Sequence, residues 1–425
     1  MIILLSIIYL IPFFILSLFF SGQFLILFFG YFLNLIVLIS QNSNSSEQAF
    51  NYFMIDNFVR AIAGILVIVL TNSFKNFSLK SLRLKENFLI SLKKYAFNKK
   101  LILILIYIQL TFIGYVFIVS PDLSILSFNR NATISITIPS IRYVYPFFTA
   151  LSPSLLASSL LSLITFKKIR LSILHLTLSL ISLINIYLIG QRGYILMTLF
   201  VAFLSSFIFG IQSLIKGKLY ISDIRKWLFI LIIFPIIYNL RTLYSIGENK
   251  LFSLQIGDLK PLKAWDGAIN AAKYLNTDIP PLINNIFNFL NHQSRINLGL
   301  QNSSDIVNTF LFSDFYYEKG FGYNITIPMD LHVSFKDEKL WIPLLLIYYT
   351  FLLLRYIKST KFFLFTKNSL PGYFLITCSF SSILTGLSGW PLALIFYLQS
   401  HLFLLIENKK ISHLYEVSTK IFKKP

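Results

Sequence analysis

Long runs of apolar residues dominate the chain, and eleven of them are close to the length that crosses a bilayer. A transmembrane helix needs about 20 mostly apolar residues. Only 13% of all residues are charged and 56% are hydrophobic, whereas a soluble domain carries about 25% charged residues. We therefore expect an all-α polytopic membrane protein with about 11 (10–12) transmembrane helices. The runs lie near residues 2–20, 24–40, 57–73, 101–119, 143–166, 171–189, 193–214, 227–240, 339–354, 369–385 and 390–406.

Lysine and arginine predict the orientation, because short loops rich in these residues stay in the cytoplasm. The stretch 75–100 carries eight basic residues and one acid, Glu86. Further basic clusters at 167–170, 216–226, 355–367 and 409–424 fall on the same side of an eleven-helix layout. That side is the cytoplasm, which places the C-terminus inside. The first two runs are separated only by Ser21-Gly22-Gln23, so the orientation of this hairpin and of the N-terminus stays open.

The same layout divides the chain into three parts. Residues 1–240 form helices one to eight, and residues 339–425 form helices nine to eleven and a cytoplasmic tail. Between them, residues 241–338 form one large periplasmic loop that contains ten of the 17 acids of the chain. A loop of this length is usually functional or has secondary structure of its own. Spacing of apolar residues predicts amphipathic helices near 262–275 and 281–290, both suited to lie along the membrane interface.

Several kinds of chemistry are excluded by what the chain lacks. It has no phosphate-binding glycine loop, no HExxH motif and no histidine or cysteine cluster, so we expect no metal and no cofactor. Cys378 is the only cysteine, which excludes an internal disulfide. The net charge of +20 belongs to the cytoplasmic loops and does not indicate nucleic acid. Within the predicted spans we find little charge or polarity beyond Arg60, His175 and Asn185. Ion-coupled transporters commonly carry ionisable residues within their spans, so this scarcity argues against such a transporter.

Arginines on the outer side are the first candidate site residues. Arg192 lies in the short turn Gly190-Gln191-Arg192-Gly193 between two apolar helices, where flanking glycines let the backbone approach a ligand closely. Arg241 begins the long loop, and Arg295 follows its second amphipathic helix. Guanidinium groups bind phosphate oxygens in a bidentate fork. Arginines that converge at one lipid–water interface therefore indicate recognition of an anionic lipid head; the alternative for each is an interfacial anchor.

The second candidate site lies late in the loop, where aromatic residues alternate with carboxylates. The segment 312–323 contributes the substrate-binding candidates Asp314, Tyr316, Tyr317 and Glu318. Aromatic faces cover the C–H surface of sugar rings, and carboxylates bind the hydroxyl groups. Asp330 and His332 follow just before the next helix, and either could accept a proton from an attacking hydroxyl. The alternative for this segment is an ordinary solvated loop.

These residues give the chain a resemblance to a known family. Gln191-Arg192-Gly193-Tyr194 resembles the arginine-containing turn of the O-antigen polymerases, and so does the late outer loop that ends in Asp330-x-x-x-Ser334-Phe335. The resemblance implies a multi-helix fold related to the C-type glycosyltransferases. It also implies that Arg192, Arg241 and Arg295 hold the pyrophosphate of a lipid-linked substrate. Relatives often have glutamate where this chain has Asp330.

O-antigen ligase shares this layout and has a functional histidine late in its large loop. His332 could correspond to that histidine, but the ligase pattern continues with asparagine and this chain continues with Val333. The polymerase is therefore preferred over the ligase.

The expected function is polymerisation of undecaprenyl-pyrophosphate-linked repeat units in lipopolysaccharide biosynthesis, at the periplasmic face of the bacterial inner membrane. Expected partners are these lipid-linked oligosaccharides, the lipid bilayer and, by the resemblance, a polysaccharide chain-length regulator. A lipid-linked oligosaccharide flippase is the alternative from another class, and it predicts a central cavity lined with charge. A structural scaffold without catalysis is the third alternative.

Overall fold

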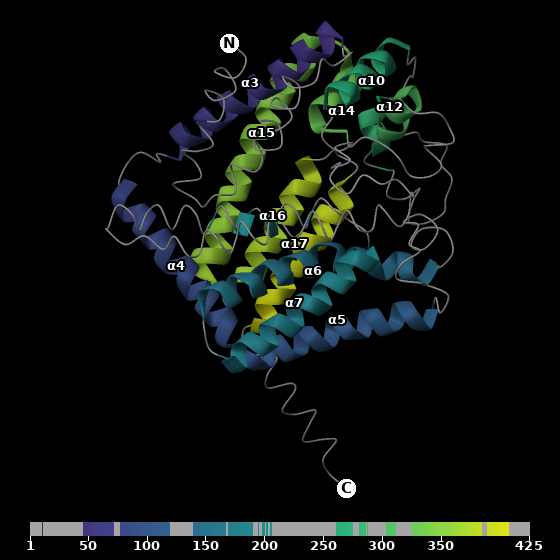
Figure 1. The fold of residues 1–425 in the computed structure, drawn as a ribbon. Coiled ribbons are helices and arrows are strands. Elements are labelled where there is room, and N and C mark those ends of the chain that lie inside the picture. Colours follow the sequence, from purple (N-terminus) through teal and green to yellow (C-terminus); the bar gives the residue numbers. More distant parts are fainter. Residues whose placement is uncertain are drawn as a thin grey trace.

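The computed structural model describes residues 46–71, 77–119, 139–166, 169–189, 261–274, 280–285, 303–311, 325–384 and 389–407, together with a few isolated positions. Within these ranges all regular structure is helical and no strand occurs. Figure 1 shows the arrangement. The helices are α3 (Glu47–Leu70), α4 (Phe77–Phe97), α5 (Lys99–Val119), α6 (Pro139–Thr165), α7 (Ile169–Ile189), α10 (Pro261–Tyr274), α12 (Ser303–Leu311), α14 (Ile327–Phe335), α15 (Glu338–Lys361), the π-helical turn η3 (Phe362–Thr366), α16 (Leu370–Leu384) and α17 (Trp390–Glu407).

Five of the described helices are long and apolar enough to cross a membrane, namely α3, α5, α6, α15 and α17. Helices α7 and α16 contain shorter apolar segments, Ser172–Ile186 and Leu370–Ile383. The expectation of an all-helical, multi-pass membrane protein is confirmed at this level. The predicted runs 2–20, 24–40 and 227–240 lie outside the described residues, as does most of 193–214. The count of about eleven spans stays a prediction.

Helix α3 begins well before the apolar run that was predicted at 57–73. Its N-terminus is capped by Ser46, whose Oγ accepts a hydrogen bond from the amide of Ala49 at 3.2 Å. The negative charge of Glu47 in the first turn interacts favourably with the positive end of the helix dipole. Because these first turns contain polar residues, the pattern of apolar residues did not predict that the helix begins here.

Helices α3 and α15 pack against each other along their length. They run in the same direction, because Tyr52 in α3 contacts Trp341 in the first turn of α15, and Asp56 contacts Tyr349 two turns further along. In Figure 1 the two helices descend side by side from the top of the molecule.

A second group is formed by α5, α6 and α7, which lie side by side in the lower half of Figure 1. Helices α16 and α17 pack against each other and against α6. The thiol of Cys378 in α16 is buried against Ser154 of α6, with 3.9 Å between Sγ and Oγ. The core therefore runs from the α3–α15 pair through α16 to α6.

The basic stretch 75–100, expected only as a cytoplasmic segment, contains helix α4. Phe88, Leu92 and Tyr95 on one face of α4 are buried, and the Tyr95 hydroxyl lies 3.2 Å from Ser159 Oγ in α6. Lys94 donates a hydrogen bond to the carbonyl of Lys367, 3.2 Å away, just after η3. Helix α4 is thus an amphipathic element that packs its apolar face on the bundle.

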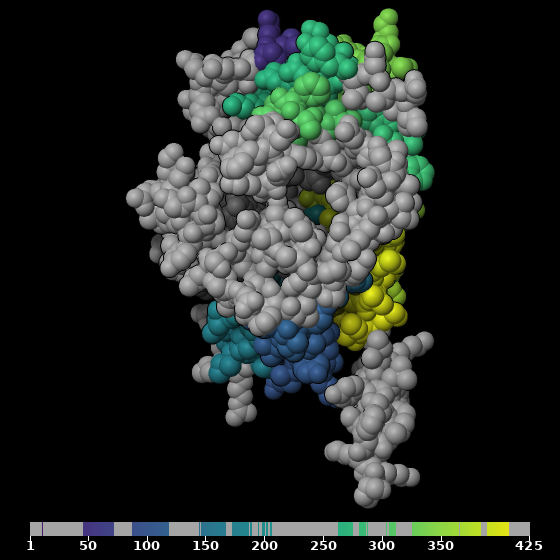
Figure 2. Space-filling view, turned by 90° about the vertical axis from the view of Figure 1, so that its right-hand side faces the viewer, coloured from purple at the N-terminus to yellow at the C-terminus, as the bar shows by residue number. Residues whose placement is uncertain are grey.

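Helices α10, α12 and α14 form a small helical layer on the end of the bundle where α3 and α15 begin. Figures 1 and 2 show this layer in green at the top, at the opposite end from α5. Helix α10 matches the amphipathic helix predicted at 262–275. Its apolar face packs inside the protein rather than along the membrane, because Trp265, Ala268 and Ala272 are all buried.

The second amphipathic helix, predicted near 281–290, is helical at 281–285, and most of its remainder lies outside the described residues. Two hydrogen bonds hold this segment to the layer. The amide of Leu282 donates to Ser334 Oγ of α14 at 2.9 Å, and Asn285 Nδ2 donates to Ser303 Oγ of α12 at 3.0 Å.

The close approach of α10 to α12 depends on Gly267. A Cβ added there would lie 2.6 Å from Leu311 Cδ1 and 2.8 Å from Val307 Cγ1. We expect Gly267→Ala to lower the free energy of unfolding by about 1–2 kcal/mol, because both side chains must shift. In the matched control Gly114→Ala, the new Cβ meets nothing within 4 Å, and alanine should stabilise helix α5 by up to about 1 kcal/mol. The thermal unfolding midpoints of the two variants in detergent test this prediction, and equal midpoints would contradict it.

Candidate functional site

Most of the predicted site residues lie outside the described part of the chain. These are Arg192, Arg241, Arg295, Asp314, Tyr316, Tyr317 and Glu318. The two catalytic candidates, Asp330 and His332, are described, and both are buried in α14.

Helix α14 is short and has distinct signals at both ends. Pro328 occupies its first turn, where a missing amide hydrogen costs nothing. The helix ends at Lys336, a non-glycine residue with φ of 59°, whose amide donates to the carbonyl of His332 at 2.9 Å. Because successive residues of a helix are rotated by about 100°, residues two apart point to nearly opposite sides. Asp330 and His332 therefore cannot meet on one atom of a substrate.

His332 belongs to a cluster of four buried rings between the layer and the spans. Its ring centroid lies 4.6 Å from that of Tyr52, 5.8 Å from Trp341 and 5.9 Å from Trp265. The other three pairs of rings also lie within 6.1 Å of each other. Trp265 and His332 come from the layer, whereas Tyr52 and Trp341 come from α3 and α15. The ring cluster is thus a packed junction that fastens the layer to two spans.

Three nitrogen atoms of this cluster have no hydrogen-bond partner among the described residues: His332 Nδ1, Trp265 Nε1 and Trp341 Nε1. Burial lowers the pKa of His332 from its ordinary 6.5 to about 4, and the nearby charge of Glu338 opposes this shift only partly. The imidazole is therefore neutral at neutral pH. A base with a pKa this low has little affinity for the proton of an attacking hydroxyl.

Acidification should destabilise the protein through His332. The folded pKa of about 4 lies below the ordinary 6.5 of an unfolded histidine. Stability is full above pH 6.5 and is lost as the pH falls toward 4, because the unfolded chain binds the proton first. The expected loss is on the order of 3 kcal/mol. Thermal unfolding midpoints measured between pH 6.5 and 4 test this loss. The midpoint of His332→Gln should depend less on pH than that of the wild type. The same pH dependence in both proteins would contradict the assignment to His332.

Asp330 has a different environment. It is buried and lies on the other side of α14 from His332. Its carboxyl group lies close enough to Tyr348 of α15 to interact electrostatically with that hydroxyl group. Helix α14 packs against the start of α15, so this carboxyl group is fixed beside a membrane span by the backbone of a buried helix.

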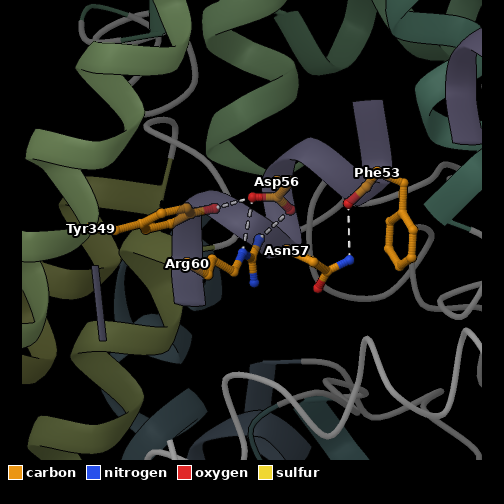
Figure 3. A network of polar contacts seen from close by, with 5 residues as sticks. All are labelled: Phe53, Asp56, Asn57, Arg60 and Tyr349. Atoms are coloured by element: carbon orange, nitrogen blue, oxygen red, sulfur yellow. Dashed lines mark hydrogen bonds and ion pairs between the residues drawn. The ribbon is translucent and has the colours of Figure 1, made fainter. Parts of the chain in front are cut away.

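A buried ion pair within α3 is the feature that the sequence reasoning missed. Figure 3 shows Asp56 between Arg60 and Tyr349. Arg60 donates from Nε to Asp56 Oδ1 at 2.9 Å and from Nη2 to Oδ2 at 2.8 Å, a bidentate arrangement. The Tyr349 hydroxyl donates to Asp56 Oδ1 at 2.8 Å, and the guanidinium lies 4.9 Å from the centroid of the Tyr349 ring.

Arg60 was noted in the sequence as a sparse charge within a span, but Asp56 lies one residue before the predicted run 57–73. The signal that could have found the pair is the spacing of four between an acid and a base within one helix. Tyr52 lies a further four residues toward the N-terminus, so the ring cluster and the ion pair occupy consecutive turns of α3. Charged and aromatic groups thus continue from the layer into the membrane span.

Within the residues that the structure describes, no group of three or more histidine, cysteine, aspartate or glutamate side chains could hold a metal ion. Fold and site together define a multi-pass helical membrane protein with a helical layer docked on one end of two spans. No protein-family model matches the chain, and no curated protein and no solved structure matches it either.

Proposed function

We propose that this protein is a glycosyltransferase of the O-antigen polymerase type, which joins undecaprenyl-pyrophosphate-linked repeat units at the periplasmic face of the bacterial inner membrane. The observation that carries the proposal is the position of Asp330. Its carboxyl group lies on a buried helix of the layer, beside the start of span α15. A glycan whose lipid anchor lies between membrane helices would extend to this level.

The distribution of charge along α15 supports the proposed orientation. At its start, next to α14, Asp337 and Glu338 are balanced by Lys336 and Lys339, whereas Arg355, Lys358 and Lys361 near its end have no acid among them. A helix of 24 residues is about 36 Å long. Because basic residues favour the cytoplasm, this excess of positive charge at the far end of α15 supports a periplasmic position for the layer.

In the proposed reaction, a hydroxyl oxygen of the new unit attacks the anomeric carbon of the growing chain. The bond between that carbon and the lipid pyrophosphate breaks, and its electron pair leaves with the phosphate oxygen. Asp330 accepts the proton of the hydroxyl group. Arg192, Arg241 and Arg295 stabilise the charge that develops on the pyrophosphate.

His332 has a positioning role in this proposal. Its low pKa makes it a poor proton acceptor, and its ring packs between Tyr52, Trp265 and Trp341. A ligase would instead depend on the late histidine as a functional group. The neutral, packed imidazole therefore supports the polymerase over the ligase.

A transporter of lipid-linked oligosaccharides is the second candidate, and the ion pair of Asp56 and Arg60 favours it. Ionisable residues inside spans commonly mark pathways for ions or substrates. This pair is bidentate and buried, which also suits a purely structural role.

The test is a gel of the surface polysaccharide from cells that lack the gene, complemented at matched expression with wild type or variants. Polymerase function predicts that deletion leaves lipid A-core with a single repeat unit. Arg192→Ala and Asp330→Asn should both fail to restore the ladder. Asp337→Asn is the matched control, because asparagine retains the N-cap that Asp337 provides for α15.

Other patterns on the gel separate the alternatives. Loss of even the single repeat unit after deletion would indicate a ligase or a flippase. An unchanged ladder after deletion would remove the protein from this pathway. A full ladder with Asp330→Asn would exclude Asp330 as the proton acceptor.

A further inference from the structure

One face of helix α7 carries a line of buried polar side chains: His175, Ser179, Ser182 and Asn185. The opposite face is apolar and exposed at Leu176, Leu180 and Ile184. The polar line therefore points toward α5 and α6, against which α7 packs.

Every member of the line has a polar atom without a hydrogen-bond partner among the described residues. These atoms are His175 Nδ1, Ser179 Oγ, Ser182 Oγ and Asn185 Oδ1. Their spacings of three and four residues put them on successive turns of one helix face. They extend over about 15 Å of helix.

Other hydroxyl groups of these helices show that the two free serines are unusual. Ser158, Ser162 and Thr177 each donate to the carbonyl four residues earlier, at 2.7, 2.9 and 3.0 Å. Ser179 and Ser182 do not make this bond. Their hydroxyl groups are available to a group that lies outside their own helix.

Gln109 of α5 closes one end of the line. Its Oε1 accepts hydrogen bonds from Ser152 and from Asn185 Nδ2, and its backbone carbonyl accepts from Asn185 Nδ2 at 3.1 Å. Gln109 Nε2 has no partner among the described residues. This end therefore offers a free amide donor, Gln109 Nε2, next to a free amide acceptor, Asn185 Oδ1.

Leaving so many polar atoms unpaired within apolar helices would cost several kcal/mol. The missing group must both donate and accept hydrogen bonds, because the free atoms include an amide N–H and an amide oxygen. The amide N–H would repel a cation, and the amide oxygen would repel an anion. Water satisfies both, and buried waters usually make about three such bonds.

We propose that α5, α6 and α7 enclose a file of water molecules along α7, the α7 water track, from His175 to Asn185. The track begins near helix α4, since His175 Nε2 lies 3.1 Å from the carbonyl oxygen of Ala96. It leads from the end of the bundle that carries Lys94 into the interior of the spans. This assignment is independent of the proposed glycosyl transfer.

Cysteine accessibility in membrane vesicles tests the track. In a Cys378→Ala background, Ser179→Cys and Ser182→Cys introduce thiols on the track. Leu180→Cys and Ile184→Cys place them on the exposed apolar face of the same helix. The reagent 2-aminoethyl methanethiosulfonate reacts with the thiolate, which forms only where water is present. We expect the track positions to react at least roughly tenfold faster than the controls.

Equal reaction rates at Ser182→Cys and Ile184→Cys would show that the region is dry and would overturn the proposal. A second measurement needs no substitution. Radiolytic labelling of the wild-type protein generates hydroxyl radicals from bound water, so it should oxidise the buried Leu178 and Ile181 beside the track. Leu375 in α16 is as buried as Leu178 and should stay unmodified. An unmodified Leu178 would contradict the track in the native chain.

Discussion

Replacement of Asp56 by leucine is expected to lower the free energy of unfolding by about 3–5 kcal/mol, because it removes the carboxylate that forms a bidentate ion pair with the buried Arg60 guanidinium. Arg60→Leu should cost a similar amount, since the buried Asp56 carboxylate then loses its positive partner and keeps, within the described part of the chain, the hydrogen bond from Tyr349. The loss is measured as the thermal unfolding midpoint in detergent and as the yield of monodisperse protein.

The double variant Asp56→Leu/Arg60→Leu is the matched control for this prediction. It removes both charges and replaces them with apolar side chains, a change that is often neutral in buried ion pairs. We expect it to recover most of the stability, apart from about 1 kcal/mol for the lost hydrogen bond from Tyr349 to Asp56. A double variant as unstable as either single variant would show that the two charges have separate structural roles.

Trp265→Ala is expected to lower the free energy of unfolding by about 3–5 kcal/mol, the usual cost of removing a large buried ring. The indole packs against rings from α3, α14 and α15, so its loss should loosen the helical layer from both spans. Limited proteolysis between α10 and α14 should accelerate in step with the loss of stability.

The control for this variant lies on the same helix. Tyr274 is 65% exposed at the end of α10, and Tyr274→Ala should change stability by no more than about 0.5 kcal/mol. Proteolysis of Trp265→Ala at the wild-type rate would show that the layer is held by other contacts, such as those of Ser46 with Asp266.

Apolar runs predicted the described spans well, because burial in lipid requires a length and composition that few other helices have. Two helical segments escaped this signal for a physical reason. Helix α4 is rich in lysine and buries one face, and the first turns of α3 alternate buried Ala49 and Tyr52 with exposed polar residues. Both owe their position to packing against elements that are distant in the chain.

The candidate site was predictable only as a set of residue types. Asp330 and His332 were expected as alternative proton acceptors just before the next helix; both lie in a helix of their own, α14, which points them in opposite directions. Asp56 was missed because it lies just outside the predicted run 57–73, although its spacing of four from Arg60 is a local signal; only its contact with Tyr349, 293 residues away, has no local pattern. The resemblance to O-antigen polymerases and the arginines that carry it are untested by the described residues.

The ion pair of α3 has a consequence for how the chain enters the membrane during synthesis. Asp56 and Arg60 belong to the same helix, so α3 can neutralise its own charges as soon as it forms. Tyr349 is synthesised 293 residues later and completes the network when α15 docks. A span that depended on a distant chain segment for its counter-ion would have to wait for that segment at the translocon, whereas α3 can be released into the lipid at once.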